Sequence, residues 1–198
     1  MSLSLRRHVL GLALAAGLPL SPQAARAGEA RAGIVLMHGK GGSPERTVAG
    51  LARQLQTQGC LVANEEMPWS GRRQYDASVA DALAQVQAAL QRLRAQGATR
   101  LFVAGHSQGG VFALLAGGRL PVDGVIAIAP GGNVAGAAFQ AQVAPALTLA
   151  REQLAQGRGD APGDFADYEG STGLRSLRTT AARYVDWFDP AGAMNQLA

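Results

Sequence analysis

Residues 105–109 of this 198-residue chain read Gly105-His106-Ser107-Gln108-Gly109, and this stretch decides the fold. It follows an apolar run at 101–104 that is typical of a buried parallel strand, and it precedes a run of small and apolar residues at 110–116 that predicts a helix packed closely on a sheet. A glycine two residues to either side of the serine allows the backbone to turn tightly without side-chain clashes. The stretch therefore predicts a strand, a sharp turn with an exposed serine hydroxyl, and a helix whose free N–H groups lie beside that hydroxyl.

A second glycine-rich turn follows an earlier apolar run. Residues 34–37 predict another buried strand, and they are followed directly by His38-Gly39-Lys40-Gly41-Gly42. With both motifs in this order, each at the end of a strand, the chain resembles the α/β-hydrolase superfamily. The resemblance implies that Ser107 is the nucleophile and that the backbone N–H groups of Lys40 and Gln108 form the oxyanion hole.

Apolar runs alternate with helical patterns along the rest of the first 130 residues, which predicts the fold class. Strands are expected over 34–37, 61–63, 101–104 and 125–129, with helices over 77–95 and from Pro44, capped by Ser43, to about Gly59. Strands that are joined by helices in this way form a right-handed, mostly parallel sheet. We therefore expect an α/β three-layer sandwich, and with 47% hydrophobic residues in 198 we expect one domain.

The resemblance also bears on the second half of the chain. Superfamily members continue with further strands and helices that carry the catalytic acid and histidine. Residues 28–198 are therefore interpreted as a partial α/β-hydrolase domain that lacks the last strands and is truncated before the acid and the histidine. Residues 134–189 are predicted to form a cap-like helical segment over the active site.

The positions of the histidines conflict with a complete triad. The chain contains three, His8, His38 and His106, and all of them precede Ser107, whereas the superfamily places its histidine after the nucleophile. His38, at the end of its strand, is a candidate surrogate base. His106 is expected to pack beneath the turn, because neighbouring side chains at a tight turn point in different directions.

Two hypotheses of function follow from the resemblance. The first is an exported, carboxylesterase-like serine hydrolase that acts through Ser107 on an ester or a related acyl bond of a small molecule. The second is a non-catalytic remnant or binding protein that keeps the fold without a triad. Trp69 either lines the mouth of the pocket or packs in the core. No cofactor is implied, and no metal site is expected because His, Cys and carboxylates do not cluster at ligand spacing.

Residues 1–27 are interpreted as a signal peptide. They combine Arg6-Arg7, an apolar stretch at 9–20 that is too short to span a bilayer, and the cleavage pattern Ala25-Arg26-Ala27. We therefore expect export to the periplasm or beyond, with no membrane association other than the signal peptide. Removal of the three arginines reduces 18 basic residues to 15, against 14 acidic ones, which argues against a nucleic-acid partner. The sequence does not specify an oligomeric state.

Overall fold

The computed structural model describes residues 31–131, 134–169 and 172–195. The predicted signal peptide lies outside these residues. The central sheet has the strand order β2-β1-β3-β4, and all three neighbouring pairs are parallel. Its strands are β1 (Ala32–Met37), β2 (Leu61–Glu65), β3 (Arg100–His106) and β4 (Gly124–Ile128). Each of them contains, or overlaps with, a strand that was expected from the sequence.

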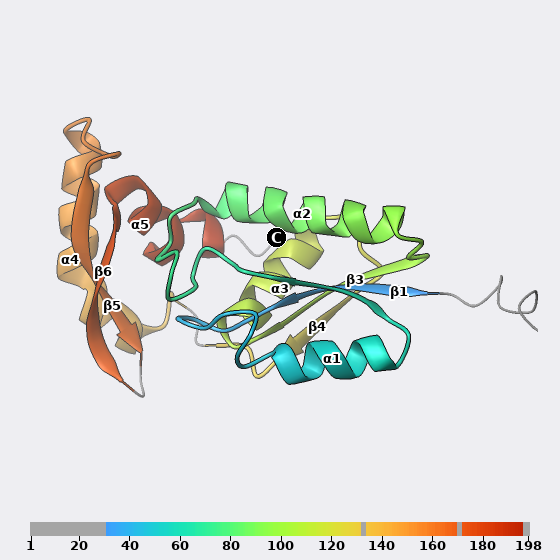
Figure 1. Cartoon of the computed structure of the whole chain (residues 1–198). Helices are drawn as coiled ribbons and strands as arrows, with labels where there is room; N and C mark the ends of the chain where they lie inside the picture. Colours follow the sequence, from blue (N-terminus) through green and yellow to red (C-terminus); the bar gives the residue numbers. More distant parts are fainter. Residues whose placement is uncertain (1–30, 132–133, 170–171, 196–198) are drawn as a thin grey trace, which may run out of the picture.

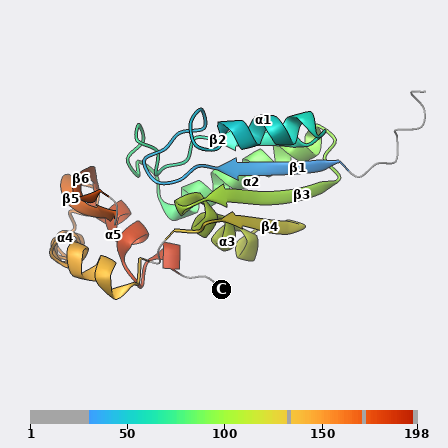
Figure 2. The same cartoon turned by 90° about the horizontal axis from the view of Figure 1, so that it is seen from below.

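Helices cover both faces of this sheet. Helix α1 (Ala49–Thr57) lies on one face, and α2 (Val79–Ala95) and α3 (Gln108–Arg119) lie on the other (Figures 1 and 2). The expected α/β class with three layers and a parallel sheet is thereby confirmed. No helix in the described part of the chain combines the length and the hydrophobicity that a bilayer span requires.

Helix α1 begins later than expected. The sequence predicted a start at Pro44 with Ser43 as the cap, but residues 44–48 form turns and the helix begins at Ala49. A long-range contact accompanies the difference, because the side-chain amide of Asn64 in β2 donates a hydrogen bond of 2.7 Å to the carbonyl oxygen of Pro44. Helix α2, in contrast, begins with a capping box in which Ser78 and Asp81 bond each other's backbone N–H groups.

The core is divided by the sheet into two clusters. Successive side chains of a strand point to opposite faces, so Val35 and Met37 belong to the large cluster beneath α2 and α3, and Ile34 and Leu36 belong to the small cluster beneath α1. All four are buried. Burial on both faces explains why the strand is a continuous apolar run in the sequence.

A second group of elements lies at the carboxyl-terminal end of the strands (Figure 1). It consists of α4 (Ala137–Ala155), an antiparallel hairpin of β5 (Pro162–Glu169) and β6 (Gly173–Thr180), α5 (Ala181–Phe188) and a short 3-10 helix, η2 (Ala193–Asn195). We call residues 134–195 of this structure the end module. The expectation that 134–189 is helical is wrong for the hairpin, because alternate residues of β5, Phe165 and Asp167, turn inward with a period of two.

Aromatic packing and several hydrogen bonds attach the end module to the sheet layer. The Trp187 ring lies 5.7 Å from that of Trp69 and 5.4 Å from that of Tyr75. The Trp187 indole N–H donates to the carbonyl oxygen of Ala77 at 2.8 Å, and a carboxylate oxygen of Asp186 accepts from the backbone N–H of Val79 at 2.6 Å. These contacts hold the module against the edge of the sheet at which β1 and β3 end.

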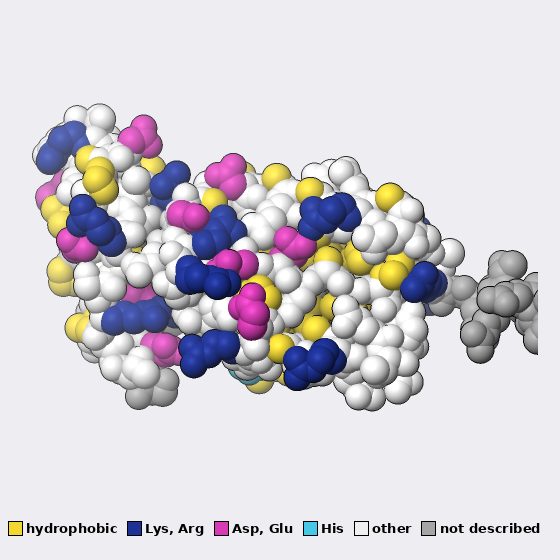
Figure 3. Space-filling model, in the orientation of Figure 1, with side chains coloured by type: hydrophobic (Ala, Val, Ile, Leu, Met, Phe, Trp, Pro, Cys, Tyr) yellow, Lys and Arg dark blue, Asp and Glu magenta, His cyan; other side chains and the backbone are white. Residues whose placement is uncertain are grey.

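Charged side chains of both signs are interspersed on the face drawn in Figure 3. Ion pairs among the described residues include Arg92 with Glu65 and Arg73 with Asp76. At the edge strand β4, the side chains of Val125 and Ile126 are exposed.

Candidate active site

Ser107 occupies a strained backbone conformation between β3 and α3. Its φ of 54° and ψ of −119° lie in a region that residues with a side chain rarely adopt. The surrounding hydrogen bonds maintain this conformation: the Ser107 N–H donates to the carbonyl oxygen of Ile128 at 3.0 Å, and the Ser107 carbonyl oxygen accepts from Gly110 at 2.9 Å and Gly131 at 3.0 Å. Such strain persists only where neighbours over-determine it, and it is a feature of functional turns.

The two glycines around Ser107 are required by close backbone contacts. A Cβ atom at Gly105 would lie 2.1 Å from the carbonyl oxygen of Gly109, and one at Gly109 would lie 2.5 Å from the carbonyl oxygen of Met37. Both distances are far below van der Waals contact. The pentapeptide therefore folds into a turn that brings the start of α3 directly against the end of β1.

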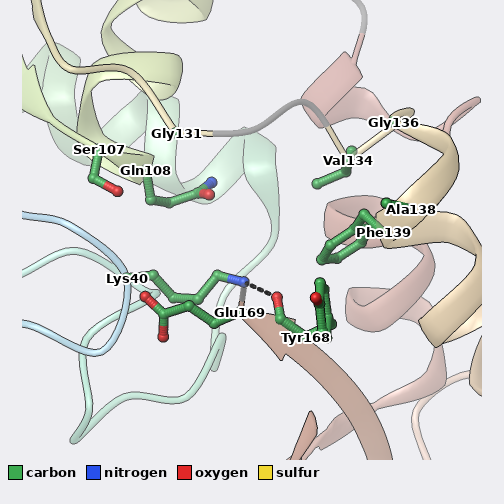
Figure 4. A pocket seen from close by; sticks show the side chains of 10 residues that line it. All are labelled: Lys40, Ser107, Gln108, Gly131, Val134, Gly136, Ala138, Phe139, Tyr168 and Glu169. Carbon is green, nitrogen blue, oxygen red and sulfur yellow. Dashed lines mark hydrogen bonds between the residues drawn. The ribbon is translucent and has the colours of Figure 1, made fainter. Parts of the chain in front are cut away.

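A cavity of about 390 Å³ opens beside Ser107 (Figure 4). Residues of the sheet layer form one wall, and residues of the end module form the opposite wall. The lining comprises Lys40, Ser107, Gln108, Gly131, Val134, Gly136, Ala138, Phe139, Tyr168 and Glu169. The structure thus places all three residues that were assigned to the nucleophile and the oxyanion hole around one pocket.

Two backbone N–H groups at this pocket are available to a ligand. Among the described residues, neither the N–H of Lys40 nor that of Gln108 donates a hydrogen bond to a protein group. Gln108 is the first residue of α3, where N–H groups have no partner within the helix. A Cβ atom at Gly39 would lie 3.2 Å from Cβ of Ser107, so the turn that carries Lys40 touches this serine. This arrangement suits an oxyanion that forms next to the serine.

His38 is buried, and both of its ring nitrogens are used within the core. Its Nε2 accepts a hydrogen bond from the Met67 N–H at 3.1 Å, so the proton resides on Nδ1, which donates to the carbonyl oxygen of Gly39 at 2.7 Å. Burial lowers the pKa of His38 below its ordinary value, and the hydrogen bond to Gly39 opposes this shift. The hypothesis of a surrogate base at His38 is therefore wrong, because neither nitrogen can reach a substrate.

His106 also faces away from the pocket. It ends β3, and its ring lies against the turn, since a Cβ atom at Gly39 would be 3.4 Å from its Nδ1. That Nδ1 is buried and has no hydrogen-bond partner among the residues that the structure places. The described lining of the pocket contains no imidazole.

Trp69 packs in the core and does not line the pocket of Ser107. Its side chain is almost fully buried, with the ring 5.0 Å from that of Phe112. Its indole N–H donates to the carbonyl oxygen of His38 at 2.7 Å. Of the two alternatives for Trp69, the core position is the observed one. Its contact with the site is indirect, because it supports the turn that follows β1.

The side chain of Lys40 links the turn after β1 to the end module, a role that the sequence did not predict. Its ammonium group donates to the Asp167 carboxylate at 2.7 Å. It also donates to the carbonyl oxygen of Tyr168 at 3.3 Å (Figure 4). Its Nζ lies 5.5 Å from the centre of the Phe139 ring. Asp167 is fully buried and is bound on its other oxygen by Arg175, with nitrogens at 2.8 and 3.0 Å. We call Lys40, Asp167 and Arg175 the ionic triad.

A signal for the ionic triad was present in the sequence. Alternation in 162–169 puts Asp167 on the same face of a strand as Phe165, and a carboxylate on a buried face requires a cation. Which cation it binds cannot be read from spacing, because Lys40 lies 127 positions away in the sequence.

No group of three or more His, Cys, Asp or Glu side chains among the described residues could hold a metal ion. The groups that the described residues present to a ligand at the pocket include the Ser107 hydroxyl, the two free N–H groups and charged side chains at the rim.

The model of a hydrolase family described as serine aminopeptidase, S33, matches residues 28–170. The chain belongs to this family. It is an α/β-hydrolase, as the resemblance in the sequence implied. The search of curated proteins gives no match.

Solved structures of lipolytic enzymes have a similar fold. A structure of the metagenome-derived lipolytic enzymes LipS and LipT is 20% identical, with a TM-score of 0.52, and the alignment covers 85% of this chain and 63% of the other. The monoacylglycerol lipase of Paleococcus ferrophilus is also 20% identical, with a TM-score of 0.56 and coverage of 83% and 66%. At this identity the likeness shows the fold alone, and the chain spans less than two thirds of either structure.

Proposed function

We propose that this α/β-hydrolase cleaves an ester or a related acyl bond of a small molecule, with Ser107 as its nucleophile. The observation that carries the proposal is the strained Ser107, at a pocket that is also lined by two residues with free backbone N–H groups. Lipolytic structural neighbours agree with an ester as the substrate.

The geometry suits acyl transfer in two steps. Oγ of Ser107 attacks the acyl carbon, and the carbonyl oxygen becomes an oxyanion that accepts from the N–H groups of Lys40 and Gln108. Each such donor typically stabilises the transition state by about 3 kcal/mol. The positive end of the α3 dipole acts in the same direction. The alcohol leaves with a proton, and water then hydrolyses the acyl-serine to release the acid.

Removal of the proton from the Ser107 hydroxyl is the step that the described residues support least. Within the described residues, no imidazole lies where it could accept the proton of the Ser107 hydroxyl. The oxyanion hole and substrate binding retain part of the rate when a base is missing. We therefore expect the 198-residue chain to acylate slowly and to turn over more slowly than a hydrolase with a full triad.

The same observation favours a second candidate function, a binding protein that keeps the pocket without catalysis. In that case a carboxylate or acyl compound would occupy the cavity, and Ser107 would act as a hydrogen-bonding group only. The two candidates differ in whether Ser107 becomes covalently modified by an acyl or phosphonyl donor.

The deciding experiment measures covalent labelling and turnover in parallel. We would follow labelling by a fluorophosphonate probe and hydrolysis of p-nitrophenyl butyrate for the wild type, Ser107→Ala and the control Ser176→Ala, an exposed serine on β6. Labelling and turnover that disappear only in Ser107→Ala support the proposal. Absence of both in the wild type would favour the binding protein, and activity retained in Ser107→Ala would refute the assignment of the nucleophile.

We also propose that the end module acts as a cap and that the protein is exported. Phe139 of α4 and Tyr168 of β5 form the wall opposite Ser107, which supports a cap that shapes the pocket. Export rests on the predicted signal peptide at 1–27 alone.

A further inference from the structure

The pocket contains a buried polar side chain that no protein group satisfies. Gln108 is 8% exposed, and its carboxamide points into the cavity (Figure 4). Among the described residues, this side chain has no hydrogen-bond partner. The proposed oxyanion hole uses only the backbone N–H of Gln108, so the carboxamide has no role in that chemistry. A ligand that fills the cavity displaces water from this carboxamide, and an amide left unpaired in the complex costs free energy, so a ligand that bonds to it is favoured.

Two further polar groups border the same cavity. The carboxylate of Glu169 lines it and forms no ion pair within the described residues, although the Thr172 hydroxyl lies 3.4 Å from one of its oxygens. Lys40 also lines it, with two of its three N–H groups donated to Asp167 and Tyr168. A ligand in the cavity therefore meets an amide that both donates and accepts, and a carboxylate that only accepts.

The local charge balance favours a neutral ligand group over a charged one. Lys40 and Arg175 contribute two positive charges beside the cavity, and Asp167 and Glu169 contribute two negative charges. A hydroxyl group fits this environment, because it can donate to a carboxylate and also exchange hydrogen bonds with an amide. The rest of the lining includes the apolar side chains of Val134, Ala138 and Phe139, together with Tyr168. It suits the carbon chain that bears the hydroxyl.

We propose that Gln108 determines specificity and that the pocket selects acyl compounds with a hydroxyl group on a short carbon chain. This inference rests on the proposed function, since it names the substrate class of the same site. Gln108 acts through its side chain on the bound part of the substrate, whereas its N–H acts on the reacting oxygen. A plain alkyl chain would leave the carboxamide unpaired, which predicts discrimination of about tenfold to a hundredfold.

The test compares matched ligands in a reactive and a non-reactive form. The reactive forms are the p-nitrophenyl esters of butyrate, 3-hydroxybutyrate and 3-aminobutyrate. The non-reactive forms are the corresponding N-methylamides, titrated into ¹⁵N-labelled protein while the side-chain amide resonance of Gln108 is followed. The proteins are the wild type, Gln108→Met, which has a similar shape but no amide, and Gln91→Met, which alters an exposed glutamine of α2.

We expect the wild type and Gln91→Met to prefer the hydroxyl ligand by at least tenfold in both forms. Gln108→Met should lose or reverse this preference, because an apolar side chain tolerates the alkyl ligand. An unchanged preference in Gln108→Met, equal binding of the alkyl and hydroxyl ligands, or no detectable binding would overturn the inference. Preference for the amine would overturn it in favour of a cationic substrate that pairs with Glu169.

The two forms separate this inference from the proposed function. Selective binding of the hydroxyl N-methylamide without ester turnover or labelling of Ser107 would refute the hydrolase and retain the ligand class. Turnover through Ser107 without selectivity would refute the ligand class and retain the hydrolase.

Discussion

Asp167→Asn should destabilise the protein strongly, because this carboxylate is fully buried and compensates two cations. The substitution keeps the shape and one acceptor oxygen but removes the negative charge. Lys40, whose side chain is 13% exposed, would then retain a charge in an enclosed site without a counterion. The Arg175 side chain is 40% exposed and can turn towards water, so its loss of a partner is less costly.

The expected loss of unfolding free energy follows from the exposed fractions of the Lys40 and Arg175 side chains. Removal of one partner of a buried ion pair typically destabilises a protein by about 3–5 kcal/mol, and the exposure of Arg175 places this case near about 3 kcal/mol. For a protein of this length, each kcal/mol lowers Tm by roughly 2–4 °C, so we expect a decrease of about 6–12 °C. Urea unfolding monitored by tryptophan fluorescence measures the free energy directly, because Trp187 lies in the end module and Trp69 lies beneath it.

The hairpin contains its own control. Asp164 lies opposite Arg178 in the same register that pairs Asp167 with Arg175, and the two ions are 3.1 Å apart. Both side chains of this second pair are more than 60% exposed, so Asp164→Asn should change the free energy of unfolding by at most about 1 kcal/mol. Equal effects of the two substitutions, within about 0.5 kcal/mol, would refute the argument that burial makes the ionic triad costly to break.

Three further predictions concern the turn, the buried histidine and export. Gly109→Ala should destabilise the protein by about 3 kcal/mol and abolish phosphonate labelling, since its Cβ would lie 2.5 Å from the Met37 carbonyl oxygen. The control Gly50→Ala in α1 has open space around the added methyl group and should stabilise the protein by up to about 1 kcal/mol. A stable Gly109→Ala protein that is still labelled would contradict this prediction. Burial lowers the pKa of His38 in the folded protein below 6.5, so the unfolded state takes up a proton at a higher pH than the folded state does. The neutral, buried His38 therefore contributes fully to stability above pH 6.5, and this contribution is lost as the pH falls through the lowered pKa of the folded state. His38→Gln should flatten the dependence of the unfolding free energy on pH between 4.5 and 6.5. This window lies above the ordinary pKa of the nearby Glu66 carboxyl group, which is lowered further in the folded protein. An unchanged slope in the variant would exclude His38 as the cause of the pH dependence. N-terminal sequencing of exported protein should find a start at or near Gly28, and retention of Met1 would argue against the signal peptide.

The order of elements around Ser107 could be predicted because its determinants are local. Apolar runs of four residues and glycines two positions from the serine act through sterics and burial over a few neighbours, and these neighbours are adjacent in the sequence. The same locality allowed Lys40 and Gln108 to be assigned to the oxyanion turn by resemblance. Strand β5 was missed because one of its two buried positions carries Asp167, so its inward face is only partly apolar, although its residues alternate.

Only the tertiary structure decided what the side chains at the site do. The spacing of His38 left open whether it acts as a base, and the contacts with Met67 and Gly39 show that its ring is occupied in the core. The ammonium group of Lys40 finds its carboxylate across 127 residues, and the carboxamide of Gln108 faces a cavity whose opposite wall comes from the end module. The physical reason is that these contacts depend on packing between segments distant in the sequence, whereas the sequence pattern that predicts the turn lies within five consecutive residues.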